Sequence, residues 1–337
     1  MKAHQITIFD IARELQISKS TVSRALTNHP NVHQETRRKV LELANKLEYQ
    51  RNMMAIRLAT QKSNIIGIIV PEFISSYFPL AIIGIQEVAT KAGYGVIISQ
   101  SNECYETEVA NAKVMLANQV DGMLISVTKE TTDFDHLKIF ERKGIPIVQF
   151  NRVSSHLSVP KVIVDDYEGA FSAVEYLIKS GRRRIAHFAG PKSLSISIRR
   201  LNGYLDALKK NNIDIDEDLI VSYDLDLEKV SAHTNRLLAL KERPDAIFAV
   251  NDPTAIEIIQ VIKKAGWQVP HDLAVIGFSN DYVSALISPP LTTVAQPVKE
   301  IGMVAAKLLL EQIKRDIGDW KASTTVLKTE LIVRGST

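Results

Sequence analysis

The stretch that decides the fold covers Ile6–Leu26 and reads ITIFDIARELQISKSTVSRAL. Its apolar residues recur every three or four positions, which predicts two short amphipathic helices joined by a tight turn. Those residues are Ile8, Ile11, Ala12 and Leu15, then Ile17, then Val22, Ala25 and Leu26. Thr7 with Asp10 forms a capping-box pattern before the first helix, and Ser18 is a suitable N-cap for the second. Helices this short are not stable alone, so a third helix is expected at about 34–47.

The second predicted helix keeps a polar face outward, made of Lys19, Ser20, Ser23 and Arg24. These side chains can bond base edges and phosphates, and one helix is narrow enough to enter a major groove. The pattern therefore predicts a DNA-binding head. A helical pair that only packs would leave the run from Thr21 to Arg24 unexplained.

This stretch resembles the DNA-binding head of the LacI/GalR family of bacterial transcription regulators. The family signature is matched by Thr7, Asp10-Ile11-Ala12, Ile17-Ser18 and Thr21–Leu26. The resemblance implies a helix-turn-helix domain at 1–50 and a hinge helix and linker at 51–63. It also implies DNA contacts at Thr7, Ser18, Lys19, Ser20, Thr21, Ser23, Arg24, Thr27, Asn52, Ala55 and Leu58. Of these, Leu58 matches the leucine that the family inserts between base pairs in the minor groove.

Charge divides the chain in the same way as the motifs. Residues 1–62 hold eleven Lys and Arg against five Asp and Glu, so the overall charge of +3 combines a basic head with a mildly acidic remainder. That asymmetry suits a nucleic-acid module joined to a different domain. The single cysteine, Cys104, excludes an intramolecular disulfide framework and is expected to be a buried small side chain. With no export signal and no membrane-spanning run in the sequence, we expect a cytoplasmic protein that does not bind membranes.

From Asn64 onward, apolar runs alternate with amphipathic helices, which predicts parallel sheets in doubly wound α/β lobes. Strands are expected at Ile65–Val70, Gly95–Ser99, Gly122–Ser126, Pro146–Phe150, Lys161–Val164, Arg184–Ala189, Ala246–Val250 and Leu273–Gly277. Helices are expected at about 79–92, 106–118, 134–143, 167–180, 198–211, 229–241, 254–265 and 298–315. Because this number of strand–helix units is too large for one core of ordinary size, we expect two lobes.

The resemblance extends over the whole chain and implies a body at 64–337 like a periplasmic binding protein. It places lobe one at about 64–160 and 292–322, and lobe two at about 161–291 and 323–337. One last strand is expected at Thr325–Val333.

The motifs of common α/β enzymes do not occur in the sequence. It lacks a Gly-x-Gly-x-x-Gly turn, a Walker loop, a Gly-x-Ser-x-Gly elbow and metal-ligand histidine spacing. Asp165-Asp166 is better explained by a strand end that caps the next helix than by a catalytic pair. We therefore expect no enzyme activity, no cofactor and no metal.

A ligand-binding cleft is the expected role of the body, because open α/β sheets bind small molecules at the carboxyl ends of their strands. The resemblance points to Ser75, Tyr77, Phe78, Asn151, Arg200, Asn251, Asp252 and Ser279. Tyr77 or Phe78 would stack on a sugar ring, unless they are ordinary core aromatics. Arg200 would bind an oxygen-rich ligand, unless it forms a structural ion pair. Because Asn151 and Ser279 stand where relatives carry carboxylates, the ligand is expected to be sugar-like and could be anionic.

Together these features predict a transcription regulator, most simply a repressor, that binds a palindromic double-stranded operator as a homodimer. A small molecule in the cleft would switch it, and further pairing to a tetramer stays open. Two alternatives remain: a regulator switched by a protein partner, with a vestigial cleft, and a sugar-binding transport protein.

Overall fold

The structure is a computed structural model that describes residues 6–50, 62–315, 320 and 322–337. The chain divides into two compact units, residues 1–63 and 64–337. The head and the body are therefore described separately. The expected hinge contacts Asn52, Ala55 and Leu58 lie outside the described residues.

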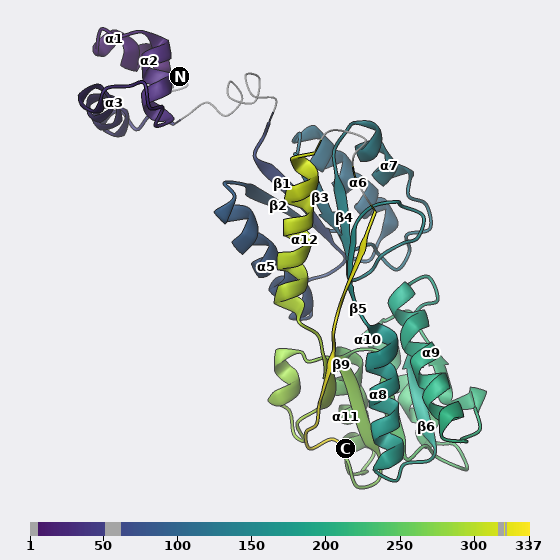
Figure 1. The fold of residues 1–337 in the computed structure, drawn as a ribbon. Coiled ribbons are helices and arrows are strands. Elements are labelled where there is room, and N and C mark those ends of the chain that lie inside the picture. The colour runs from purple at the N-terminus through teal and green to yellow at the C-terminus, as the bar shows by residue number, and fades with distance from the viewer. Residues whose placement is uncertain (1–5, 51–61, 316–319, 321) are drawn as a thin grey trace. The chain divides into compact units, whose positions relative to one another are not determined.

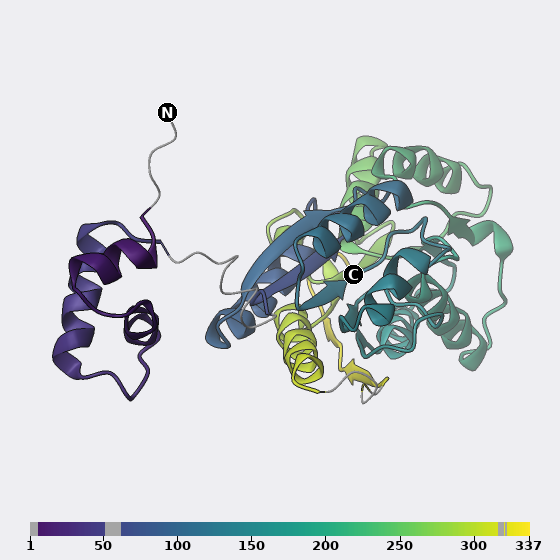
Figure 2. The same cartoon turned by 90° about the horizontal axis from the view of Figure 1, so that it is seen from above.

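The head consists of three helices, α1 (Ile8–Glu14), α2 (Lys19–Leu26) and α3 (Gln34–Lys46). Figure 2 shows these three helices in purple, gathered around a common centre. Their apolar stripes meet in one small core of Ile11, Ala12, Val22, Ala25, Val32, Val40, Leu43 and Ala44. The Thr7 amide and hydroxyl both donate to Asp10 Oδ2, at 2.9 and 2.7 Å, so the capping box predicted for α1 is present.

The first sheet of the body has six parallel strands in the order β11-β5-β4-β3-β1-β2. The strands are β1 (Ile65–Val70), β2 (Gly95–Gln100), β3 (Gly122–Ile125), β4 (Ile147–Phe150), β5 (Lys161–Val164) and β11 (Thr324–Leu327). The helices of this lobe are α5 (Tyr77–Lys91), α6 (Tyr105–Ala117), α7 (Asp135–Arg142) and α12 (Val298–Ile313).

The second sheet has the order β12-β10-β9-β8-β6-β7, and only β12 runs antiparallel to its neighbour. Its strands are β6 (Ile185–Ala189), β7 (Ile220–Ser222), β8 (Ala246–Ala249), β9 (Ala274–Ser279), β10 (Thr292–Ala295) and β12 (Glu330–Ile332). The accompanying helices are α8 (Asp166–Lys179), α9 (Ser195–Lys210), α10 (Leu227–Leu238) and α11 (Asp252–Lys264), with 3₁₀ turns η1 (Glu217–Leu219) and η2 (Tyr282–Ala285). The α/β class with two parallel-sheet lobes is confirmed.

The chain passes between the two lobes three times: after β5, after β10, and between β11 and β12 (Figure 1). The expected lobe boundaries differ from this arrangement. β5 pairs with β4 in the first sheet although it was expected in lobe two, and β10 pairs with β9 in the second sheet although it was expected in lobe one. The single strand expected at Thr325–Val333 is two strands, one in each sheet. The expected boundaries were implied by the resemblance and were approximate. Periodicity could not refine them, because it locates strands along a chain but carries no information about their neighbours.

Helices α5 and α12 lie close together in the first lobe because two glycines permit it. A Cβ on Gly84 would collide with the Lys299 carbonyl, and a Cβ on Gly302 with the Ala81 carbonyl. This contact joins residues from the two ends of the body into one core. Among the described residues, no helix combines the length and the apolarity needed to cross a membrane.

Candidate functional site

The candidate nucleic-acid interface is the outer face of α2. Lys19, Ser20, Ser23 and Arg24 are all exposed there, while Val22 and Ala25 hold the opposite face in the core. Ser18 begins the helix as its N-cap: its Oγ accepts the Thr21 amide at 3.1 Å. Exposed Thr7 and Ser18, half-buried Thr21 and exposed Thr27 complete the expected set within the described residues. The Thr27 hydroxyl already donates to the Ser23 carbonyl at 3.0 Å, so its structural role is to cap the helix end.

Phe9 on α1 was missed by the sequence analysis. Its ring is exposed, and the Lys19 ammonium lies over it, 5.3 Å from the ring centre. A cation–π contact of this kind limits where Lys19 can reach. The sequence signal was present, because Phe9 is an apolar residue outside the helical stripe of Ile8, Ile11 and Leu15.

The body contains a cleft of about 540 Å³ lined by both lobes. This volume falls within the range of small-molecule sites. The lining includes seven of the eight expected ligand residues, namely Ser75, Tyr77, Phe78, Asn151, Arg200, Asn251 and Ser279. They come from segments that follow β1, β4 and β8, from β9 and from α9, so strand carboxyl ends of both sheets form the walls.

Asp252, the eighth expected residue, does not line the cleft. It is fully buried, and its carboxylate accepts bonds from the Ser284 and Thr293 hydroxyls at 2.6 Å and from the Asp281 amide at 2.7 Å. The reason is local: Asn251 is the N-cap of α11 and faces the cleft, while the next side chain turns inward beside Gly277. Asp252 therefore joins α11, β10 and η2 from behind the cleft.

Arg200 lines the cleft with a guanidinium that is already engaged. Its Nε and Nη2 donate to Asp166 Oδ1 at 2.8 and 2.6 Å, its Nη1 donates to the Val250 carbonyl, and the group lies 3.7 Å from the centre of the Phe278 ring. A guanidinium has five N–H donors, so two remain available for a ligand. Asp166 balances its charge, which weakens the argument for an anionic ligand.

The two expected stacking aromatics belong largely to the core. Tyr77 and Phe78 are buried and pack edge to face with ring centres 5.2 Å apart, and Phe78 also contacts Phe150. Burial raises the pKa of the Tyr77 hydroxyl well above its ordinary value. Neither ring offers an open face of the kind a stacked sugar needs.

Seven charged cleft residues were missed, and four of them illustrate a common position after the carboxyl end of a strand. These four are Glu103 after β2, Lys129 after β3, Arg152 after β4 and Asp281 after β9. Arg152 Nη1 donates to both carboxylate oxygens of Glu103, at 2.7 and 2.8 Å, and the pair is largely buried. Strand ends alone could have identified these positions, because open α/β sheets place ligand contacts there.

The cleft also concentrates unusual backbone. Five non-glycine lining residues have positive φ: Glu103, Asn151, Leu225, Ser279 and Asn280. For Leu225, with φ of 64°, no short polar side chain compensates, and such conformations cost on the order of 1–3 kcal/mol. Backbone strain of this kind clusters at functional sites, which supports the cleft as one.

Among the described residues, direct hydrogen bonds join the two lobes at three places, one of them from the Ser195 hydroxyl to the Val153 carbonyl at 3.1 Å. Beside α5, Asp281 Oδ2 of the second lobe accepts the Ser76 amide at 2.9 Å and the Ser76 hydroxyl at 2.7 Å. Elsewhere, Lys129 Nζ donates to the Asp224 carbonyl at 2.8 Å and the Ser193 hydroxyl donates to the Lys129 carbonyl at 2.7 Å. The conformation described is therefore one in which the lobes touch across the cleft.

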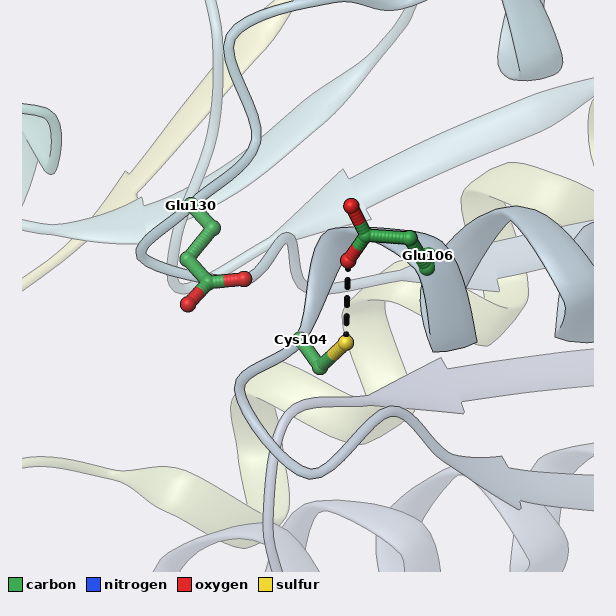
Figure 3. Close-up of side chains that lie close together, drawn as sticks. All are labelled: Cys104, Glu106 and Glu130. Carbon is green, nitrogen blue, oxygen red and sulfur yellow. Dashed lines mark hydrogen bonds between the residues drawn. The ribbon is translucent and has the colours of Figure 1, made fainter.

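Cys104 lies beside Glu106 and Glu130 at the start of α6 (Figure 3). It is half-buried rather than buried as expected, because it occupies the N-cap position of that helix. Local bonds account for the group: the Cys104 thiol donates to Glu106 Oε2 at 3.2 Å and the Tyr105 amide donates to Glu130 Oε2 at 3.1 Å. We assign no metal site to it.

Comparison with known proteins covers both units. Residues 7–52 match the family described as "Bacterial regulatory proteins, lacI family", and residues 174–337 match "Periplasmic binding protein-like domain". The HTH-type transcriptional repressor CytR of Escherichia coli (strain K12) is 34% identical over 98% of this chain and 96% of its own. Two solved structures are similar: the lac repressor dimer bound to operator and the anti-inducer ONPF (25% identity, 99% of both chains, TM-score 0.87), and a CelR–cellobiose complex (26% identity, 98% of this chain and 100% of that one, TM-score 0.75).

Proposed function

The chain belongs to the LacI family of DNA-binding transcription regulators, and from that premise we propose that it binds a two-fold symmetric operator as a homodimer and is switched by a small neutral polyol. The observation that carries this proposal is the cleft of about 540 Å³ between lobes that follow an intact helix-turn-helix head. A transport role, one of the two alternatives, leaves that head without a purpose.

Operator binding is supported by the composition of the α2 face. Its exposed hydroxyls and cations, from Lys19, Ser20, Ser23 and Arg24, are donors suited to base edges and phosphates. One head of this size reads one half-site, so two heads related by a two-fold axis match a palindrome. Asn52, Ala55 and Leu58 would add minor-groove contacts, with Leu58 as the wedge at the operator centre.

A homodimer is supported by an apolar surface made of Leu80, Ile83, Ile98, Tyr282, Val283 and Leu286. These side chains are 39% to 72% exposed. The elements that carry these side chains are neighbours, because β2 packs on α5 and the Tyr282 amide donates to the Ser76 hydroxyl at the start of α5. Solvent-exposed apolar side chains gathered in this way mark an interface, and a second copy of the chain is the partner that two-fold operators need.

The charges of the cleft favour a neutral ligand. Each cationic lining residue has a partner within the protein: Arg152 with Glu103, Arg200 with Asp166, Lys299 with Glu87, and Lys129 with the Asp224 carbonyl. The walls carry the uncharged polar side chains of Ser75, Asn151, Asn251, Ser279 and Gln296. Some of their atoms already bond neighbours, as the Ser75 hydroxyl does with Glu72, and Ser279 with Gln296. Such a surface selects a sugar-like molecule without net charge.

Two measurements test the proposal. Selection of bound sequences from random DNA by the full-length protein is expected to return one palindrome. Calorimetry with neutral sugars, sugar phosphates and nucleobases is expected to give heat with a neutral sugar, and that sugar should change affinity for the selected operator. If only a sugar phosphate gives heat, the proposal that the ligand is uncharged would be contradicted. If an operator is selected but no small molecule gives heat in calorimetry, the result would favour a regulator switched by a protein partner.

A further inference from the structure

Asp281 is the part of the cleft with the most unusual set of partners. One carboxylate oxygen, Oδ1, accepts the Val283 amide and begins η2, while the other, Oδ2, accepts both donors of Ser76 from the opposite lobe. Ser76 and Asp281 are 205 positions apart in the sequence, so the bond joins segments with no local reason to meet. Asp281 is largely buried, where a bond to a charged acceptor is stronger than in water.

The position of Asp281 depends on Asp252. The Asp281 amide donates to Asp252 Oδ2, and Ser284, at the end of the same turn, donates its hydroxyl to the same oxygen. The other oxygen of Asp252 accepts the Thr293 hydroxyl of β10. A buried carboxylate with three donors thus fixes the backbone from which the Asp281 side chain reaches across the cleft.

The interlobe contact between Lys129 and Asp224 lies elsewhere along the cleft. Asp281 follows β9 and Asp224 follows β7, and three steps separate β9 from β7 in the second sheet. Neighbouring strands are about 4.8 Å apart, so roughly 14 Å separates the two contacts. Contacts this far apart each restrain a different side of the cleft.

We propose that the Ser76–Asp281 contact, positioned by Asp252, is a clasp that holds the lobes closed over the ligand. Asp252 acts through this clasp and does not touch the ligand. The clasp joins α5 to η2, and both carry the apolar surface assigned to the subunit contact, so opening it also changes the shape presented to the second subunit. The link to ligand and subunit rests on the proposed function.

The clasp itself is tested without any ligand, by hydrogen exchange of the full-length protein. Ser76→Ala is expected to speed amide exchange by about tenfold in two segments, 72–78 and 279–284, because it removes one bond to a charged acceptor across the lobes. Ser75→Ala is the matched control. Its hydroxyl bonds Glu72 within the first lobe, so exchange should change only in 72–78. Ser76→Thr, which keeps the hydroxyl, should restore wild-type exchange in both segments.

Asp252→Asn extends the test to the positioning residue. It removes an acceptor oxygen while keeping the volume, and exchange in 72–78 should rise although Asp252 has no bond to that segment. If amide exchange in 279–284 is no faster in Ser76→Ala than in Ser75→Ala, the clasp does not exist. A clasp shown by exchange in a protein that gives no heat with any neutral sugar would instead overturn the proposed function, so the two failures are distinguishable.

Discussion

At the scale of single residues, Arg200 forms the structural ion pair that the sequence had left as an alternative to ligand binding. Its buried guanidinium holds Asp166 at the start of α8 and the Val250 carbonyl after β8, and covers the Phe278 ring. Removing one partner of a buried ion pair leaves the other charge buried without compensation. Arg200→Ala is therefore expected to lower the free energy of unfolding by about 3–5 kcal/mol, measured by urea denaturation. The exposed neighbour Arg199→Ala is the control and should change it by less than about 0.5 kcal/mol. Equal stability for both variants would show that the pair contributes nothing.

His187 predicts a pH dependence. Its ring is fully buried between Tyr204 and Phe248, with Nδ1 donating to the Phe248 carbonyl at 2.9 Å, and burial lowers its pKa from 6.5 to about 4. As the pH falls below 6.5, His187 becomes protonated in the unfolded chain, whereas in the folded state it stays neutral down to about pH 4. Stability from this group is complete above pH 6.5 and is lost between pH 6.5 and 4, by about 3 kcal/mol in total.

The measurement is the difference in unfolding free energy between wild type and His187→Gln at pH 7, 5.5 and 4. The variant should lose less stability on acidification than wild type does. The exposed His271→Gln is the control, and its curve should parallel the wild-type curve. Parallel curves for both variants would mean that His187 titrates normally.

The sequence predicted which positions lie at the cleft better than it predicted where their side chains point. Seven of eight expected positions line the cleft, yet Asp252 turns away from it and Tyr77 and Phe78 are held in the core. A position relative to a strand end follows from the sequence pattern. The direction of a side chain depends on neighbours from distant segments, such as Thr293 beside Asp252, and these become adjacent only in the folded chain.

At the scale of elements, α2 carries the prediction on specificity. Lys19 and Ser20 open this helix on its exposed face, and the first residues of a recognition helix are those that reach base edges. Exchanging the two, as Lys19→Ser with Ser20→Lys, keeps composition and charge but moves the cation by one position. Selection from random DNA should then return a different half-site, with the thermal midpoint of the head unchanged.

The matched control for α2 is Lys39→Ser on α3, where the lysine pairs with Glu35 at 3.0 Å. That variant should select the wild-type sequence. An unchanged operator for the exchanged pair would remove Lys19 and Ser20 from the specificity set.

At the scale of the whole molecule, the apolar surface on α5, β2 and η2 predicts assembly. Ile83→Asp places a charge at an exposed position of α5 and should convert the dimer to monomers in sedimentation, with loss of operator affinity of at least tenfold because two half-sites are no longer bound together. Val114→Asp makes the same change on exposed α6 and should leave a dimer. A dimeric Ile83→Asp protein would place the subunit contact elsewhere.

The threefold passage of the chain between lobes has a consequence for how the protein is made. The last fourteen residues, from Thr324 to Thr337, supply an edge strand to each sheet, and α12 shortly before them completes the first core. During synthesis, the head therefore leaves the ribosome and can form its own core long before either lobe can finish folding. A chain broken off near its end would present two unfinished sheet edges, which invite aggregation and degradation. Degradation of such a chain would also remove its DNA-binding head.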